Sequence, residues 1–305
     1  MKTPPYLKPG DKIAIVAPAG KIEKDKIDEA TQTLESWGLK IVLGNNLLKK
    51  DYQYSATDEE RANDFQNVLD DFSVKAILCA RGGYGSNRII DTLDFNSFTK
   101  SPKWIIGFSD ITVFHSHIHS NFGIDTIHGT MTAGLKDVEE NNPGIDSLRA
   151  ALFGEKMDYH FEAQSLNQKG NAEGILCGGN LAILCSLIGT PSDIQTDGKI
   201  LFIEEVGEYL YRVDRMMRQL KRAGKLRNLA GLVIGGLTEM KENDNPFGKT
   251  AHEIIKECVD EYDYPVCFDF PAGHQDDNKA MIFGRKIHLE VNEMVSLSFG
   301  SGEGN

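Results

Sequence analysis

The chain has 305 residues, of which 40% are hydrophobic and 26% are charged, and its formal net charge is −12. This composition is that of a globular protein with one large or two medium-sized domains. The negative charge argues against general binding to nucleic acid or anionic lipid, because both need a basic surface that neutralises phosphates. The sequence contains no export signal and no apolar run of about 18 residues that could span a membrane. We therefore expect a cytoplasmic protein.

The first half of the chain alternates between predicted strands and predicted helices. Apolar runs predict strands at 12–17, 40–43, 74–79 and 103–106. Apolar residues at helical spacing predict a helix ending at Gly38, one starting at a capping box of Thr57 and Glu60, one over 86–93, and one after Ser109. This order predicts a parallel, Rossmann-like sheet covered on both faces, with functional residues at the carboxyl ends of its strands.

The second half continues the alternation after a polar segment. Residues 154–173 lack clear periodicity, so we expect a linker between a first domain at 1–153 and a second at 174–305. Further strands are predicted at 174–180, 199–206, 230–235 and 265–269. Helices are predicted at 181–188, before Gly224, and after a capping box of Thr250 and Glu253. The fold class is thus α/β with two domains, and the second is expected to end in a β-hairpin of 286–291 and 294–299.

Cysteine and histidine patterns give no metal site. The five cysteines include no C-x-x-C pair and mostly lie in apolar segments, which favours buried thiols over disulfides, metal ligands or a nucleophile. His115, His117 and His119 fall in the helix predicted after Ser109, where only the first and third can converge. Because no cysteine or acidic partner lies nearby in the sequence, we expect no metal, and the role of this run stays open.

The segment 104–110 places Ser109 where an α/β hydrolytic enzyme holds its nucleophile. An apolar strand stops at Gly107, and after one aromatic residue Ser109 opens the next helix. A hydroxyl on such a turn projects outward, and the N–H groups of the first helical turn beside it can stabilise an oxyanion. The alternative is a serine that only caps the helix.

A catalytic serine needs a base, and the base needs an acid that orients it. His274 lies in a polar loop just past a predicted strand, where catalytic residues of α/β proteins usually sit; a solvent-facing loop histidine is the alternative. Glu204 and Glu205 end the strand predicted at 199–206. Adjacent strand residues point to opposite faces, so at most one of them can address the histidine, and periodicity does not say which.

The segment Arg81–Gly85 reads RGGYG and connects a strand to a helix. Its glycines let the backbone approach a ligand closely, which suits a second oxyanion donor or a phosphate cradle, whereas the alternative is a plain tight turn. The segment is not the G-x-G-x-x-G of a dinucleotide site, and we expect no cofactor. Arg81 can pair with a substrate carboxylate through two hydrogen bonds; the alternative is a surface ion pair.

Five segments together resemble the LD-carboxypeptidase family of serine peptidases. They are 81–85, 107–110 with 128–129, 178–181, 202–205 and 273–274, in the same order and spacing. The resemblance covers nearly the whole chain. It implies a catalytic triad of Ser109, Glu204 and His274 split between the two domains, and an oxyanion hole formed by the backbone N–H groups of Gly83 and Asp110.

The resemblance also implies an activity. Such an enzyme removes the terminal D-alanine of murein tetrapeptides in the cytoplasm during cell-wall recycling, without a cofactor, and family members are commonly homodimers. Close relatives instead cleave peptide-nucleotide antibiotics and confer self-immunity; residues 84–89 favour the recycling branch. Arg81, chosen on its chemistry rather than on the family, is our candidate for reading the substrate carboxylate. Two rival functions remain, a non-catalytic two-domain protein that binds a peptide or sugar, and a nucleotide-dependent enzyme that uses the glycine loop.

Overall fold

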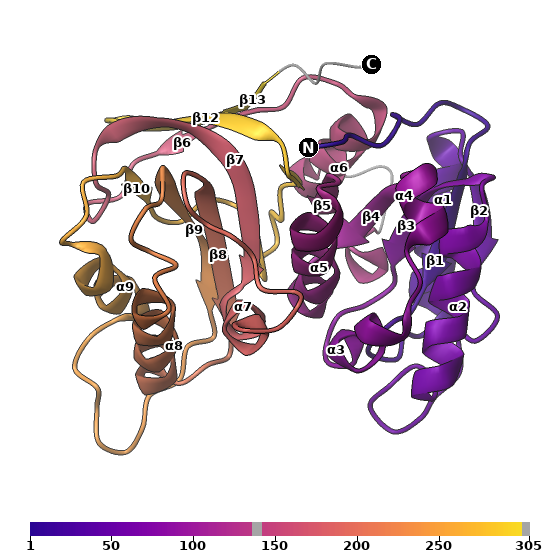
Figure 1. The fold of residues 1–305 in the computed structure, drawn as a ribbon, viewed down its shortest axis with the longest axis horizontal. Coiled ribbons are helices and arrows are strands. Elements are labelled where there is room, and N and C mark those ends of the chain that lie inside the picture. Colours follow the sequence, from indigo (N-terminus) through magenta and orange to yellow (C-terminus); the bar gives the residue numbers. More distant parts are fainter. Residues whose placement is uncertain (136–141, 301–305) are drawn as a thin grey trace.

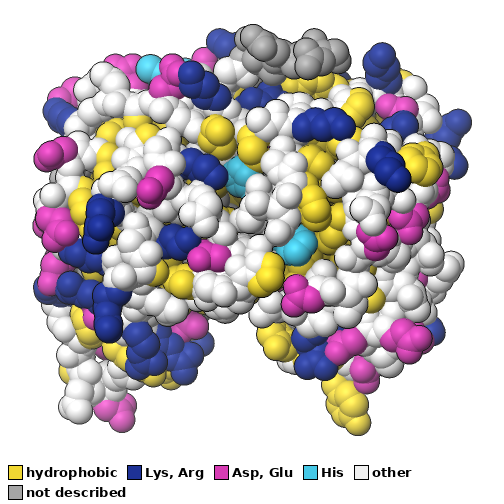
Figure 2. Space-filling view, viewed as in Figure 1, with side chains coloured by type: hydrophobic (Ala, Val, Ile, Leu, Met, Phe, Trp, Pro, Cys, Tyr) yellow, Lys and Arg dark blue, Asp and Glu magenta, His cyan; other side chains and the backbone are white. Residues whose placement is uncertain are grey.

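The computed structural model describes residues 1–135 and 142–300. Two sheets form two lobes that lie side by side in Figure 1. In Figure 2 a notch separates the lobes along the lower edge of the molecule, and acidic and basic side chains are interspersed over the face that is drawn. Of the described helices, none has both the length and the apolar character needed to cross a bilayer.

The first sheet is parallel except for one edge strand. Its members are β1 (Lys12–Val16), β2 (Lys40–Leu43), β3 (Val74–Cys79), β4 (Trp104–Gly107), β5 (Thr126–His128) and β11 (Met281–Phe283). They lie in the order β11-β5-β4-β3-β1-β2. All pairs among the first five strands are parallel, as predicted, whereas β11 runs antiparallel to β5. The second half of the chain therefore supplies one edge of the first sheet.

Helices cover both faces of the first sheet, as the alternation predicts. Helices α1 (Lys24–Ser36) and α6 (Pro143–Phe153) belong to the same apolar cluster as Ile13 and Ile15 of β1. The opposite cluster joins Ala14 and Val16 to α2 (Asp58–Asp70), α4 (Asn96–Lys100) and α5 (Thr112–Phe122). Successive residues of β1 thus face opposite layers, which explains its continuous apolar sequence.

Two local predictions in this half have different outcomes. The capping box of Thr57 and Glu60 is present at the start of α2. The helix predicted over 86–93 is instead α3 (Ser86–Ile89) followed by a 3-10 turn, η1 (Ile90–Thr92). The Thr92 hydroxyl donates to the Ile89 carbonyl at 2.7 Å, so this acceptor is satisfied locally rather than by a continued α-helix.

The second sheet is mixed. Its strands are β6 (Asp158–Glu162), β7 (Gly170–Asn180), β8 (Ile200–Val206), β9 (Gly231–Thr238), β10 (Val266–Cys267), β12 (Lys286–Val291) and β13 (Met294–Phe299). Their order is β10-β9-β8-β7-β12-β13-β6, in which β7 to β10 are parallel and the predicted hairpin of β12 and β13 is antiparallel. One face packs against α7 (Leu181–Leu187), α8 (Leu210–Arg222) and α9 (Ala251–Val259), and α9 starts at its predicted capping box.

Residues 154–173 are not the irregular segment that we predicted. They contain the edge strand β6 and the first residues of β7. Tyr159 of β6 is buried, whereas Asp158, His160 and Glu162 on the other side of the strand are exposed. The alternation was therefore present in the sequence, but at an edge strand its polar half dominates the composition.

Helix α5 lies between the lobes and bonds to both (Figure 1). On one side, His115 holds the Thr126 hydroxyl and the Gly107 carbonyl through its two ring nitrogens, each at 2.9 Å. On the other side, His117 Nδ1 lies 2.9 Å from the Ser192 hydroxyl, and the Thr112 hydroxyl accepts from the Asn180 N–H at 2.9 Å. Two histidines of the H-x-H-x-H run thus connect parts of the fold.

All five cysteines are buried and free, as the sequence predicts. Their burial in apolar surroundings raises the pKa of Cys177 to about 11 and that of Cys267 to about 12. These thiols stay protonated near neutral pH, so they are poor nucleophiles.

Candidate active site

Ser109 occupies a strained turn between β4 and α5. It is the first residue of a 3-10 turn, η2 (Ser109–Ile111), and its φ is +62°. A non-glycine residue in this region costs on the order of 1–3 kcal/mol and persists where the surrounding structure enforces it, which is common at functional sites. The turn therefore has the strained backbone that is typical of a nucleophile between a strand and a helix, and the role of Ser109 stays a prediction.

The glycine loop lies directly against this serine. A Cβ atom placed on Gly82 would lie 3.0 Å from Ser109 Cβ and 3.2 Å from its hydroxyl oxygen, closer than side-chain atoms normally approach. The Gly20 N–H donates to the Gly82 carbonyl at 2.9 Å and fixes the loop from the other side. A side chain at position 82 would press against the serine, and the plain-turn alternative does not account for this contact.

The two amides expected to form the oxyanion hole belong to these touching segments. Within the described part of the chain, the Gly83 N–H donates to no backbone carbonyl. The Asp110 N–H donates to none outside the 3-10 turn η2. An oxyanion hole needs such preorganised donors beside the nucleophile. The role of these two N–H groups as oxyanion donors stays a prediction, and both belong to segments that touch at Ser109.

The Asp110 carboxyl group has a separate structural role. Its Oδ2 accepts the Ser86 N–H at 2.8 Å, so it bonds the residue that opens α3. Burial raises the pKa of this carboxyl, and the bonds to Ser86 and the nearby charge of Arg61 partly offset that effect. Asp110 therefore couples the serine turn to the end of the glycine loop.

Glu204 and His274 meet at the carboxyl end of β8. His274 Nδ1 lies 2.6 Å from Glu204 Oε2, and the glutamate is completely buried whereas the imidazole is 23% exposed. Burial of the imidazole opposes protonation, but the hydrogen bond to Glu204 and its charge outweigh burial and raise the pKa of His274. A carboxylate that holds Nδ1–H leaves Nε2 as the basic nitrogen, which is the arrangement of a catalytic base.

Glu205 points the other way, as adjacent strand residues must. Its Oε2 accepts the Ala182 N–H at 2.8 Å, and its Oε1 accepts the Asn180 side-chain amide at 3.0 Å. Both bonds lie at the start of α7. Burial raises the pKa of Glu205, although its hydrogen bonds partly offset this. The strand alternation thus separates the two carboxylates, and only Glu204 reaches the histidine.

His274 lies beside the serine turn. Its ring packs edge-on against Phe108, the residue before Ser109, with 4.9 Å between ring centroids. No hydrogen bond joins the Ser109 hydroxyl to the imidazole among the described residues. In enzymes of this kind that bond often tightens only in the complex with substrate. The structure therefore brings the three predicted residues into one region, with the Glu204–His274 contact already formed.

A cavity of about 150 Å³ opens beside the same turn. Phe108 and Gln275, neighbours of Ser109 and His274, both line it, and Arg81 lies at its wall. Arg81 donates to the Lys21 carbonyl at 3.0 Å and has no ion pair with a carboxylate in the described residues. The alternative of a surface ion pair is thus not observed among the described residues, and the predicted pairing of Arg81 with a substrate carboxylate stays a prediction.

The sequence analysis missed one buried residue near this site. Arg61 lies on α2 with its side chain fully buried, and its guanidinium reaches the glycine loop. It stands four residues before Phe65 and seven before Val68, which are both buried, so it shares their helical face. An arginine in phase with the apolar residues of a helix was the available signal.

Both halves of the chain match known sequence families. Residues 13–129 match a sequence family described as the LD-carboxypeptidase N-terminal domain, and residues 173–289 match the LD-carboxypeptidase C-terminal domain. A protein named as a probable murein peptide carboxypeptidase from Bacillus subtilis is 34% identical over 305 residues, covering 99% of this chain and 96% of that protein.

Solved structures give the same result for the fold. The crystal structure of muramoyltetrapeptide carboxypeptidase from Oxalobacter formigenes has a TM-score of 0.85 and 28% identity, covering 95% of this chain and 98% of the other. The microcin C7 self-immunity protein MccF has a TM-score of 0.86 at 22% identity, with 98% of each chain covered. The latter likeness shows the shared fold alone.

Proposed function

The chain belongs to the LD-carboxypeptidase family, and from this premise we propose that it is a serine carboxypeptidase that releases the terminal D-alanine of murein tetrapeptides. The observation that carries the proposal is the buried carboxylate of Glu204 bonded to His274 beside the strained turn of Ser109. A protein that only binds a peptide or sugar needs no such carboxylate–imidazole pair next to a half-buried serine on a strained turn.

In the proposed reaction the Ser109 hydroxyl attacks the carbonyl carbon of the L,D-amide bond, and His274 Nε2 accepts its proton. Glu204 keeps the imidazole oriented and stabilises its cationic form. The Gly83 and Asp110 N–H groups bind the oxyanion of the tetrahedral intermediate. The imidazolium then protonates the leaving amine of D-alanine, and a water molecule activated by His274 hydrolyses the acyl-enzyme and releases the tripeptide. The route uses no cofactor.

Removal of only the last residue requires a group that reads a free carboxylate. We assign this role to Arg81, because its guanidinium lines the cavity beside the serine turn and has no carboxylate partner among the described residues. A guanidinium can hold a carboxylate through two parallel hydrogen bonds. The cavity would then hold the leaving D-alanine.

We further propose the context in which the enzyme works. The names of its relatives fit cell-wall recycling, and we propose that the enzyme works in the cytoplasm. We propose 1–153 as the nucleophile domain and 174–305 as the domain of the acid and base. The strands within 154–173 belong to the sheet of the second domain, and β11 crosses back to the first sheet. A homodimer is expected from the family resemblance, and sedimentation equilibrium would test it.

Incubation with a murein tetrapeptide, followed by mass spectrometry, tests the proposed function. The expected product is the tripeptide with one alanine lost. A peptide-nucleotide substrate in a parallel reaction tests the antibiotic-immunity alternative, and a nucleotide titration of the free protein tests the nucleotide-dependent alternative. Faster cleavage of the peptide-nucleotide, or no cleavage of the tetrapeptide, would contradict the proposal.

A further inference from the structure

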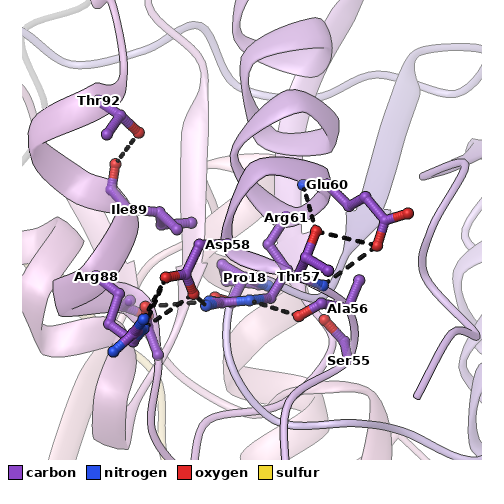
Figure 3. A network of polar contacts seen from close by, with 12 residues as sticks. Pro18, Ser55, Ala56, Thr57, Asp58, Glu60, Arg61, Arg88, Ile89 and Thr92 are labelled. Atoms are coloured by element: carbon purple, nitrogen blue, oxygen red, sulfur yellow. Dashed lines mark hydrogen bonds and ion pairs between the residues drawn. The ribbon is translucent and has the colours of Figure 1, made fainter. Parts of the chain in front are cut away.

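The buried guanidinium of Arg61 connects three loops, one of which is the glycine loop. Nε donates to the Ala56 carbonyl at 3.2 Å, Nη1 donates to the carbonyls of Pro18 and Gly85, the latter at 3.1 Å, and Nη2 pairs with Asp58. Figure 3 shows Arg61 at the centre of this network, with Arg88 reaching the same aspartate from the solvent side. A planar group with donors in several fixed directions is suited to such a position.

One peptide unit of the glycine loop is held at both ends. Its carbonyl is that of Gly85, which accepts from Arg61 Nη1 at 3.1 Å and from the Arg88 N–H at 3.0 Å. Its N–H is that of Ser86, which donates to Asp110 Oδ2 at 2.8 Å. A cation thus bonds the negative end of this peptide dipole, and a carboxyl group bonds the positive end. The dipole is fixed by charge on both sides.

Only glycine permits this arrangement. Gly85 has a φ of +147°, and a Cβ atom placed on it would lie 2.7 Å from Arg61 Nη1. The contact with the guanidinium and the unusual backbone conformation therefore occur together. Two residues earlier in the same loop stands Gly83, whose N–H is one of the two proposed oxyanion donors.

We propose that Arg61 is a positioning residue for the oxyanion hole. It fixes the Gly85–Ser86 peptide, and through it both donor segments, because Gly83 precedes this peptide in the loop and Asp110 bonds its N–H. Arg61 touches no reacting atom itself. The inference rests on the proposed serine mechanism, since an oxyanion hole matters only if Ser109 is acylated.

The variant that tests this role is Arg61→Lys, compared with Arg88→Gln as a matched control. Lysine keeps the positive charge but lacks the planar fork, so it cannot bond Gly85, Pro18 and Ala56 at once. Displacement of catalytic groups by about 1 Å can cost on the order of 100-fold, so we expect kcat to fall ~10–100-fold with KM changed less than about threefold. The Arg88 side chain shares Asp58 and the Tyr54 ring with Arg61. Only the backbone N–H of Arg88 donates to the Gly85 carbonyl, at 3.0 Å, and Arg88→Gln keeps that bond, so kcat should stay within about twofold.

A second readout separates positioning from general stability. A phosphonate analogue of the tetrapeptide, which mimics the tetrahedral intermediate, should lose affinity for Arg61→Lys in proportion to the loss of kcat/KM. Tetrapeptide binding to a Ser109→Ala, Arg61→Lys double variant should match binding to Ser109→Ala alone. Unchanged kcat, or equal losses of phosphonate and tetrapeptide affinity, would overturn the proposal.

Asp58→Asn is the second variant for this test if Arg61→Lys does not fold. It weakens the Nη2 contact of Arg61 and the pair with Arg88 at the partly exposed end of the network, and a smaller fall in kcat without a change in KM is expected. Arg88→Gln controls for the lost pair with Arg88. A wild-type kcat in this variant would then count against the proposal. Ser109→Ala alone separates the serine mechanism from the positioning role of Arg61. Activity in that variant would refute the serine mechanism itself. If the variant is inactive, the Arg61 variants decide the positioning role.

Discussion

The two lobes contribute to the site by different means. The first holds Ser109 and the proposed oxyanion donors through backbone geometry, with a positive φ at the serine, a glycine in contact with it, and a buried arginine below the loop. The second supplies Glu204 and His274 through side chains at the end of β8 and in the loop after β10. The strained turn and the proposed oxyanion donors thus lie on one side of the site, and the groups proposed to transfer protons lie on the other.

The histidines of the two lobes show the same contrast. In the first lobe, burial lowers the pKa of His115 to about 4 and that of His119 to about 3, so both are neutral near neutral pH. In the second lobe, the pKa of His274 is raised, because the hydrogen bond and charge of Glu204 overcome the effect of burial. The environment of each imidazole therefore fits packing in one lobe and proton transfer in the other.

The largest expected effect is that of Ser109→Ala, which removes the nucleophile from the first lobe. Loss of a triad nucleophile lowers kcat by ~10³-fold or more, while binding residues stay in place. Alanine at φ +62° carries the same backbone strain as serine, so the melting temperature should change little. Steady-state kinetics on the tetrapeptide with thermal melting checks both points, and turnover near the wild-type rate would refute the serine mechanism.

The neighbouring carboxylates of β8 provide the next test, which acts on the second lobe alone. Glu204→Gln keeps the shape of the side chain but removes the charge that stabilises the imidazolium, so kcat should fall ~10²–10⁴-fold with little change in KM. Glu205→Gln is the matched control, because Glu205 bonds the start of α7 and not His274. If the Glu205 variant were the less active one, our choice of the triad acid would be wrong by one residue.

Much of this contrast could be predicted from the sequence, because it depends on local periodicity. Apolar runs predicted the parallel strands of the first sheet, and the alternation along β8 predicted that Glu204 and Glu205 diverge. The positions of Ser109 and His274 at the ends of strands also followed from the alternating order of elements.

What could not be predicted depends on contacts between distant segments. Strand β11 has only three residues, and nothing in Met281–Phe283 indicates that it pairs with β5 of the other half. The bond from Arg61 to Gly85 likewise joins residues that are 24 positions apart through a buried cation. Periodicity gives the face on which Arg61 lies but not the carbonyl that it meets.

A smaller effect is expected at the substrate carboxylate. Arg81→Gln should raise KM for the tetrapeptide ~10–100-fold, because a charge-assisted pair is lost, and should affect kcat less. A tetrapeptide with a C-terminal amide should be a poor substrate for the wild type and should discriminate little between the two enzymes. Arg88→Gln controls for the loss of one surface cation near the loop. An equal effect on acid and amide substrates would remove Arg81 from carboxylate recognition.

The test with the smallest expected effect changes only the pH. The pH dependence of activity should depend on the second lobe, and that of stability on the first. Activity needs neutral His274, and since its pKa is raised, kcat/KM should fall with decreasing pH already above the ordinary histidine value of 6.5. Glu204→Gln should move this limb to lower pH.

The pH dependence of the free energy of unfolding should instead depend on the buried histidines of the first lobe. His115 has a folded pKa of about 4, below its unfolded value of 6.5, so the unfolded chain binds more protons between these values. The free energy of unfolding should therefore decrease as the pH falls through this window, by on the order of 3 kcal/mol for this residue. His115→Gln should flatten the decrease measured by urea unfolding, whereas His274→Ala should leave it in place. If the histidine of the second lobe governed acid stability instead, the division between packing and proton-transfer histidines would be wrong.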